Sequence, residues 1–397
     1  MLVLVAPGQG AQTPGMLTPW LDLPGTPEQL GWWSAVSGLD LVHYGTRAAA
    51  ERIRDTAVAQ PLLVATGLAA AGALFPHESD AHSTLGAAAG HSVGELTAAA
   101  VAGALSPETA LVLVRERGRA MAVASAQAPT GMTAVLGGDP DDVLAHLDKH
   151  GLSPANVNGA GQVVAAGTLS DLAAFAAEPP PGARLRPLPV AGAFHTPHMA
   201  SAVDHLRALA VAAPVTDPHV RLLSNADGAV VHHGREMLDR FVAQVSSPVR
   251  WDLCLRTMGD LGVTAVLELP PAGTLCGLVR RALPSVETLA VKTPADLDAA
   301  RQLLSRHSAQ SATPAPPWRL VVAPLAGIFR LGEVLLGAVL PQGGAVGTIR
   351  SRRDEQPVTA PYGGTVVEVL VEDGDPVAPG QPLVRLHPEV APEGALA

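Results

Sequence analysis

The chain is 397 residues long and 48% hydrophobic, which is enough to build the cores of two or more compact units. Its formal net charge is −10, and no basic stripe with interleaved aromatic residues is present, which argues against nucleic acid as a partner. No apolar run reaches the length expected of a membrane span, and residues 1–6 lack a basic region. We therefore expect no membrane association and a cytoplasmic location.

Two residue types are scarce. The two cysteines, Cys254 and Cys276, lack C-x-x-C spacing and lie in apolar segments, so we expect them to be buried free thiols. Lysine occurs only as Lys149 and Lys292, and arginine supplies the other basic side chains. We expect neither a metal nor an organic cofactor.

The chain opens with a segment typical of a buried strand, residues 2–6, followed by the Gly-rich stretch Pro7-Gly8-Gln9-Gly10-Ala11-Gln12. A turn directly after the first strand of an α/β sheet lies at the carboxyl edge, where such folds bind ligands. The pattern G-x-G-x-x-G and the P-loop lysine are both absent, which argues against a phosphate loop. Gln9 is instead placed to offer its backbone N–H to an oxyanion.

The segment Gly90-His91-Ser92-Val93-Gly94-Glu95 follows a small apolar run and precedes a helical pattern over residues 95–105. A strand, a sharp turn and a helix in that order hold a serine hydroxyl in a strained position where it can act as a nucleophile. The N–H groups at the helix start favour negative charge at the same place. The motif alone also fits an ordinary Gly-Ser helix start.

Residues 1–306 alternate strand-like and helical segments, which predicts an α/β fold with a hydrolase-like parallel sheet. A different texture interrupts it over about 125–190 and suits a small ferredoxin-like insertion. Its predicted strands are 132–137, 162–167 and 184–189, and its predicted helices are 141–150 and 170–177. Beyond the insertion we expect strands at 222–224 and 265–269 and a closing helix at 296–306.

Residues 307–317 are polar and proline-rich and fit a semi-rigid linker. Over 318–390 we expect a small β-barrel, which resembles the biotinyl/lipoyl-like carrier domain, with 322–327 as its first strand. Residues 331–347 fit this fold poorly. Such domains carry their cofactor on a lysine, but alignment places Arg353 near that position and no lysine follows Lys292. We therefore expect a carrier fold without an attachment point.

Several motifs in register over about residues 1–300 resemble the malonyl-CoA:acyl-carrier-protein transacylases and the related acyltransferase domains of polyketide synthases. The motifs are the Gly8–Gln12 loop, the Gly90–Glu95 elbow, Arg117, Asn156-Val157-Asn158, Gly161-Gln162-Val163-Val164, Gly192-Ala193-Phe194-His195 and Gln244-Val245-Ser246-Ser247-Pro248-Val249. The family usually has a glycine where this chain has Pro270, which puts the local loop geometry in doubt.

The resemblance implies a Ser-His pair in which Ser92 is the nucleophile and His195 the base. A backbone carbonyl near Gln244 would orient the histidine, in place of the usual acid. The N–H groups of Gln9 and Val93 would form the oxyanion hole.

The resemblance also implies the residues that bind the substrate. Arg117 would clamp the free malonyl carboxylate, and Phe194 would favour malonyl over methylmalonyl by its bulk. Asn158 would lie close to the histidine. His91 is better suited to packing or to contacting the substrate than to acting as the base, because adjacent residues of an elbow point in different directions.

The implied activity is transfer of malonyl from malonyl-CoA to the phosphopantetheine thiol of an acyl carrier protein, for fatty acid or polyketide synthesis. Three alternatives remain open. The chain could be an α/β-hydrolase-type thioesterase, although that family normally places an acid and then a histidine late in the chain. It could serve a malonate decarboxylase system. It could also be a non-enzymatic carrier or scaffold whose C-terminal barrel is the working part.

Overall fold

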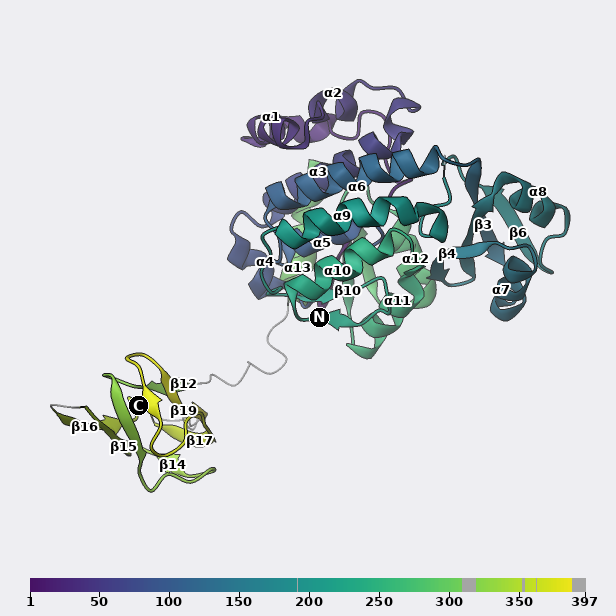
Figure 1. The fold of residues 1–397 in the computed structure, drawn as a ribbon. Helices are drawn as coiled ribbons and strands as arrows, with labels where there is room; N and C mark the ends of the chain where they lie inside the picture. Colours follow the sequence, from purple (N-terminus) through teal and green to yellow (C-terminus); the bar gives the residue numbers. More distant parts are fainter. Residues whose placement is uncertain (191, 309–318, 352–353, 362, 388–397) are drawn as a thin grey trace. The chain divides into compact units, whose positions relative to one another are not determined.

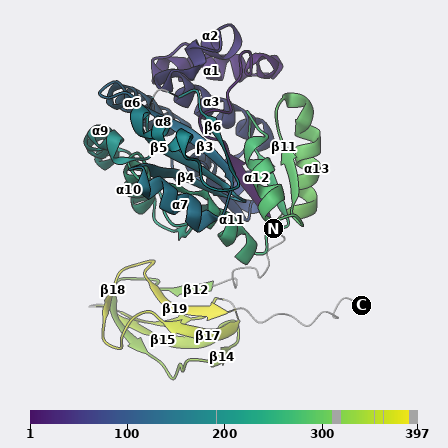
Figure 2. The ribbon, with the colours of Figure 1, turned by 90° about the vertical axis from the view of Figure 1, so that its right-hand side faces the viewer.

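The computed structural model describes residues 1–190, 192–308, 319–351, 354–361 and 363–387. The chain divides into two compact units, Met1–Gln310 and Ser311–Ala397, and each unit has its own core (Figures 1 and 2). Arg353 and the predicted linker from residue 309 onward lie outside the described residues.

The first unit alternates strands with helices (Figure 1). Its helices are α1 (Thr26–Ser37), α2 (Leu41–Thr46), α3 (Thr56–Leu74), α4 (Glu78–Thr84), α5 (Gly94–Val101), α6 (Pro107–Ser125), α7 (Pro140–Lys149), α8 (Leu169–Ala177), α9 (Ala200–Ala212), α10 (Gly234–Gln244), α11 (Trp251–Asp260), α12 (Thr274–Ala282) and α13 (Leu297–His307). Short 3-10 helices are η1 (Thr18–Asp22), η2 (Arg52–Arg54), η3 (Pro197–Met199) and η4 (Pro294–Asp296).

Two sheets organise this unit. The strands are β1 (Leu2–Ala6), β2 (Ala87–Gly90), β3 (Thr130–Gly137), β4 (Ser153–Gly159), β5 (Gln162–Thr168), β6 (Ala183–Pro187), β7 (Arg221–Leu223), β8 (Val230–Val231), β9 (Val249–Arg250), β10 (Ala265–Glu268) and β11 (Glu287–Ala290). The main sheet has the order β11-β10-β1-β2-β7-β8, in which only the edge strand β8 runs antiparallel. This confirms the predicted α/β class with a parallel sheet.

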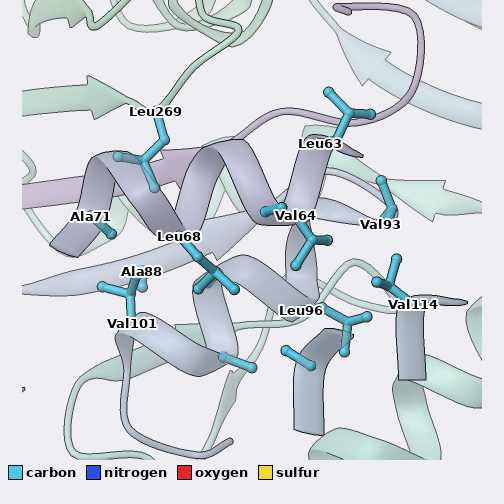
Figure 3. Packing of buried hydrophobic residues seen from close by; sticks show 14 of the residues in the cluster. Leu63, Val64, Leu68, Ala71, Ala88, Val93, Leu96, Val101, Val114 and Leu269 are labelled. Carbon is cyan, nitrogen blue, oxygen red and sulfur yellow. The ribbon is translucent and has the colours of Figure 1, made fainter. Parts of the chain in front are cut away.

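Both faces of the main sheet are covered, and successive residues of β1 enter different cores. Leu2 and Leu4 join the larger cluster with α3, α5 and α6, whereas Val3 and Val5 join a second cluster with α11 and α12. Burial on both faces explains why β1 reads as a continuous apolar run. Figure 3 shows side chains of α3, β2 and α5 in the larger cluster.

The expectation that no segment is long and apolar enough to span a membrane is wrong for α3. This 19-residue helix has a mean hydropathy of 1.6 over its most apolar window, but 83% of that window is buried inside the unit. Its apolar character is that of a core helix, because it packs against α5 and α6.

The second sheet has the order β6-β3-β5-β4-β9 (Figure 1). The first four strands are antiparallel and come from one stretch of chain, with α7 between β3 and β4 and α8 between β5 and β6. The fifth strand, β9, comes from a later part of the chain and pairs in parallel with β4. The predicted strands and helices of this stretch are present, and β4 was missed.

The second unit consists of two four-stranded sheets around a core that includes Phe329, Ile349 and Leu386. One sheet has the order β12-β19-β17-β14 and the other β16-β15-β13-β18. The strands are β12 (Arg319–Val322), β13 (Gly327–Leu331), β14 (Val339–Leu340), β15 (Ala345–Arg350), β16 (Glu355–Thr359), β17 (Gly364–Val369), β18 (Pro376–Val377) and β19 (Pro382–His387). The predicted strand over 322–327 is wrong, because β12 ends where that segment begins and β13 starts where it ends.

The elbow between β2 and α5 is crowded backbone. A Cβ on Gly90 would lie 2.0 Å from the carbonyl carbon of Gly94, and a Cβ on Gly94 would lie 2.2 Å from the carbonyl oxygen of Ala6. Neither obstacle is a side chain that can rotate away. The chain can therefore turn this sharply only with glycine at both positions.

We expect Gly90→Ala to lower the free energy of unfolding by about 1–3 kcal/mol or more, because the added methyl must displace backbone. Gly72→Ala is the matched control: it lies in α3 with nothing within 4 Å of the added Cβ. That change should stabilise the helix by about 0.5–1 kcal/mol. Urea unfolding of both variants tests the comparison, and equal stability of the two would contradict the steric argument.

Candidate active site

Three loops that follow adjacent parallel strands meet at the carboxyl edge of the main sheet. Gln9 follows β1, Ser92 follows β2 and Asn225 follows β7. This is the edge at which open α/β sheets bind ligands. Ser92 and Asn225 are in direct contact, since the Ser92 N–H donates to Asn225 Oδ1 at 2.7 Å.

Ser92 and His195 face each other with strained backbones. Ser92 Oγ lies 2.8 Å from His195 Nε2. Both residues have positive φ, 53° and 60°, although neither is glycine. Such conformations cost about 1–3 kcal/mol each and persist only where the surroundings hold them. Both side chains are nearly buried, with 8% and 4% exposure.

The other ring nitrogen of His195 defines its tautomer. Nδ1 lies 2.7 Å from the backbone oxygen of Gln244, which can only accept a hydrogen bond, so Nδ1 carries the proton and Nε2 is free to accept one. Burial first, then the charge of Arg117, lowers the pKa of His195 to about 3, against the opposing effect of the Gln244 carbonyl. The ring is therefore neutral near pH 7.

The backbone N–H groups of Gln9 and Val93 are the predicted oxyanion hole. Val93 is the N-cap of α5. The Gln9 side chain donates to Thr56 Oγ1 at 3.1 Å, which fixes the loop after β1. Among the described residues, the N–H groups of Gln9 and Val93 have no hydrogen-bond partner. The pair is thus available to an external oxygen, and its use as an oxyanion hole stays a prediction.

Arg117 is 1% exposed at the middle of α6 and forms no ion pair within the described residues. Its Nη1 donates to Gln60 Oε1 at 2.7 Å, and its Nη2 donates to Gln244 Oε1 at 3.0 Å and to Ser92 Oγ at 3.3 Å. Its buried Nε has no partner there. Burial lowers the pKa of Arg117 to about 10, so the guanidinium stays charged at neutral pH.

One aromatic ring lies beside the charged group of Arg117. The Arg117 guanidinium lies 5.2 Å from the centroid of the Phe241 ring, a cation–π arrangement. Phe194, directly before His195, is buried in the larger core cluster. Its predicted effect on acyl-group size stays a prediction.

Asn158 contacts the other histidine of the site, and its predicted closeness to His195 stays a prediction. Its Oδ1 bonds Nε2 of His91 at 2.9 Å, so the ring it contacts is that of the elbow residue. Burial lowers the pKa of His91, which keeps this ring neutral, and the ring also lies 5.7 Å from that of Trp251. Because Asn158 lies on β4, this bond joins the second sheet to the elbow.

Sequence reasoning missed three polar residues of this site. Gln60 is a lone amide in the apolar helix α3, Asn225 follows β7, and Glu95 stands in the first turn of α5. A signal existed for Asn225, because it directly follows a predicted strand of a parallel sheet. Glu95 was part of the elbow motif but received no role.

The structure also describes the two cysteines, the candidate metal ligands and the turn at Pro270. Cys254 and Cys276 are free and buried, as expected. Within the described residues, no group of three or more His, Cys, Asp or Glu side chains could hold a metal ion. Pro270 and Pro271 line a surface pocket with Ala11 and Pro14, so this turn neighbours the loop after β1.

Comparisons with known proteins bear on residues 3–308, which match the acyl transferase domain family. The chain belongs to this family. It is 50% identical over 303 residues to the malonyl CoA-acyl carrier protein transacylase of Mycobacterium tuberculosis (strain ATCC 25618 / H37Rv), covering 75% of this chain and 98% of that protein. The predicted relation to the transacylases is thereby confirmed.

Solved structures agree. The crystal structure of MCAT from Mycobacterium tuberculosis has a TM-score of 0.73 and covers 76% of this chain and 99% of its own. A malonyl-transacylase in complex with a type II PKS acyl-carrier protein has a TM-score of 0.70 at 28% identity, covering 76% of this chain and 99% of that one. The family match ends at residue 308, before the second unit.

The lowered pKa of His195 makes a prediction for acid pH. Because the free enzyme holds this ring neutral down to about pH 3, kcat/KM for acylation should not fall by half near pH 6.5, as it would for an unperturbed histidine. The unfolded chain does protonate near pH 6.5, so acidification below that value also lowers the free energy of unfolding. Rates should therefore be measured alongside circular dichroism. Half-loss near pH 6.5 in protein that is still folded would contradict the prediction.

Proposed function

We propose that the first unit transfers a malonyl group from malonyl-CoA to the phosphopantetheine thiol of an acyl carrier protein, through an acyl-enzyme on Ser92. The observation that carries the proposal is the position of the Ser92 hydroxyl, 2.8 Å from His195 Nε2 and 3.3 Å from Arg117 Nη2. The nucleophilic oxygen of Ser92 is thus in contact with both a neutral base, His195, and a cation without an ion-pair partner, Arg117.

The chemistry follows from the tautomer of His195. Nε2 takes the Ser92 proton as Oγ attacks the thioester carbonyl, and the new oxyanion accepts from the N–H groups of Gln9 and Val93. The carbon–sulfur bond then breaks, and the same proton goes to the departing CoA sulfur. In the second half, His195 takes the proton of the carrier thiol as its sulfur attacks the ester carbonyl. The bond between that carbon and Ser92 Oγ then breaks, and His195 returns the proton to Oγ.

Arg117 supplies the selectivity for a carboxylate-bearing acyl group. All its hydrogen-bond acceptors in the free enzyme are neutral oxygens, and one of its donors is unused, so a malonyl carboxylate would provide the missing counter-charge. An acyl group without a carboxylate leaves the cation buried and unpaired, which is costly. Phe194 would limit bulk at the α-carbon, and His91 with Asn158 would contact the substrate.

Three alternatives receive less support. A hydrolase triad would present a carboxylate to His195 Nδ1, whereas the group there is the Gln244 carbonyl. A pure scaffold would not need two residues with strained backbones beside a buried cation. The names of the relatives favour transfer to an acyl carrier protein over a malonate decarboxylase system.

We also propose a cytoplasmic location.

We further propose a ferredoxin-like fold for the second sheet of the first unit and a biotinyl/lipoyl-like fold for the second unit. The order β6-β3-β5-β4 with α7 and α8 between strands supports a ferredoxin-like subdomain. The two small antiparallel sheets over 319–387 support a biotinyl/lipoyl-like fold. This unit would be an accessory, since no lysine after Lys292 exists to carry biotin or lipoate.

The acyl-enzyme can be tested directly. Incubation with labelled malonyl-CoA should leave one malonyl group per chain, and Ser92→Ala should abolish it because no other residue takes over the attack. Intact-mass spectrometry locates the increment, and adding a holo acyl carrier protein should remove it. Label retained by Ser92→Ala would refute the assignment, and rapid loss of label to water without a carrier would indicate a thioesterase.

Arg117→Ala should lower kcat/KM for malonyl-CoA by about 10- to 150-fold, the worth of a hydrogen bond to a charged group. Acetyl-CoA should lose much less, since it has no carboxylate. Arg119→Ala, an exposed arginine of the same helix, is the control and should change neither rate. An equal fall for both thioesters would assign Arg117 a structural role instead.

A further inference from the structure

One buried charge has no part in the steps above. Glu95 is 7% exposed and forms no ion pair within the described residues. Its carboxylate accepts two hydrogen bonds, at Oε1 from the backbone N–H of Asn225 (2.6 Å) and at Oε2 from Nε2 of Gln244 (2.7 Å). Burial raises the pKa of Glu95, and the hydrogen bond from Asn225 and the charge of Arg117 oppose this shift. Because both carboxyl oxygens face N–H donors, the form that these bonds stabilise is the ionised carboxylate. Burying a carboxylate that has no ion-pair partner costs free energy unless hydrogen bonds compensate. The two hydrogen bonds of Glu95 supply that compensation.

The bond to Glu95 Oε2 orients the side chain of Gln244. This amide lies between two charges: its oxygen accepts from Arg117 Nη2, and its nitrogen donates to Glu95 Oε2. With the amide reversed, an NH2 group would face the guanidinium and an oxygen would face the carboxylate. The two charges therefore select one orientation. The backbone oxygen of the same residue accepts from His195 Nδ1.

The bond to Glu95 Oε1 acts on the nucleophile through Asn225. Asn225, held by Glu95 through its backbone N–H, accepts from the Ser92 N–H at 2.7 Å and donates through Nδ2 to the Gly90 oxygen at 2.7 Å. These two bonds span the elbow and hold Ser92 in its strained conformation. A third contact, from Gln244 Nε2 to Asn225 Oδ1 at 3.1 Å, closes the network.

We propose that Glu95 is a positioning residue for malonyl loading: it ties Asn225 to Gln244, and so aligns Ser92, His195 and the carboxylate-binding Arg117. The inference rests on the proposed function, because the aligned groups are those of malonyl transfer. Glu95 touches neither the substrate nor the reacting atoms in this scheme, and acts only through its two neighbours.

The isosteric change Glu95→Gln tests this without creating a cavity. Two N–H donors face the Glu95 side chain, but a glutamine offers them one oxygen and one NH2 group. One donor must then face another donor, and either Asn225 or Gln244 loses its anchor. Glu28→Gln, on the exposed side of α1, makes the same chemical change outside the network and is the matched control.

The measurement is the single-turnover rate constant for acylation of the full-length chain by malonyl-CoA and by acetyl-CoA, at a temperature where every variant is folded. We expect Glu95→Gln to slow malonyl loading by about 10- to 100-fold and to lower the malonyl-to-acetyl ratio. Glu95→Asp keeps the charge and should recover part of the rate, and Glu28→Gln should match the wild type.

A merely structural role predicts a lower unfolding midpoint with an unchanged rate constant and ratio in the folded fraction, and that result would overturn the proposal. If Glu95→Gln fails to fold, Glu95→Asp decides the matter, since wild-type rate and ratio in that variant would also overturn it. The two proposals fail differently: a wild type that forms no malonyl-enzyme defeats the proposed function, whereas normal loading by both wild type and Glu95→Gln defeats only this inference.

Discussion

An unpaired buried cation is the constraint on which the site depends. The Arg117 guanidinium is held by oxygens of Gln60, Gln244 and Ser92, none of which carries a charge. Burial first, and then the charge of Arg117, lowers the pKa of His195, so the base is neutral in the free enzyme. A carboxylate arriving beside Arg117 would cancel that charge and make the ring more basic at the moment when it must take a proton. Substrate binding and base strength are thus coupled through one charge.

The parts of the site that could be predicted from sequence are those set by local backbone. The turns at Gly8–Gln12 and Gly90–Glu95 can be recognised from their glycines. In the second turn, the crowded backbone requires glycine at both Gly90 and Gly94. The contact between Ser92 and His195 spans 103 residues, and no periodicity predicts it. Only the resemblance between whole motifs made that pairing available, together with the carbonyl of Gln244.

What could not be predicted depends on strand order and on tertiary pairing. Asn225 reaches Ser92 because β7 lies beside β2, although 133 residues separate the two side chains. The strand β4 contains Pro154 and two asparagines, so its local preference is poor, and it forms because it pairs with β5 on one side and β9 on the other. The mistaken strand over 322–327 contains Pro324, which lacks the N–H that a ladder needs.

The short pairing of β4 with β9 affects how easily the elbow around Ser92 is exposed to solvent. It consists of two register pairs, Asn156 with Val249 and Val157 with Arg250, next to the bond between Asn158 and His91. So short a ladder opens at a lower free energy than the main sheet, whose strands are buried on both faces. A local opening there separates the second sheet from the elbow while the parallel core stays intact. Hydrogen exchange at the elbow would then report a sub-global event, distinct from unfolding of the unit.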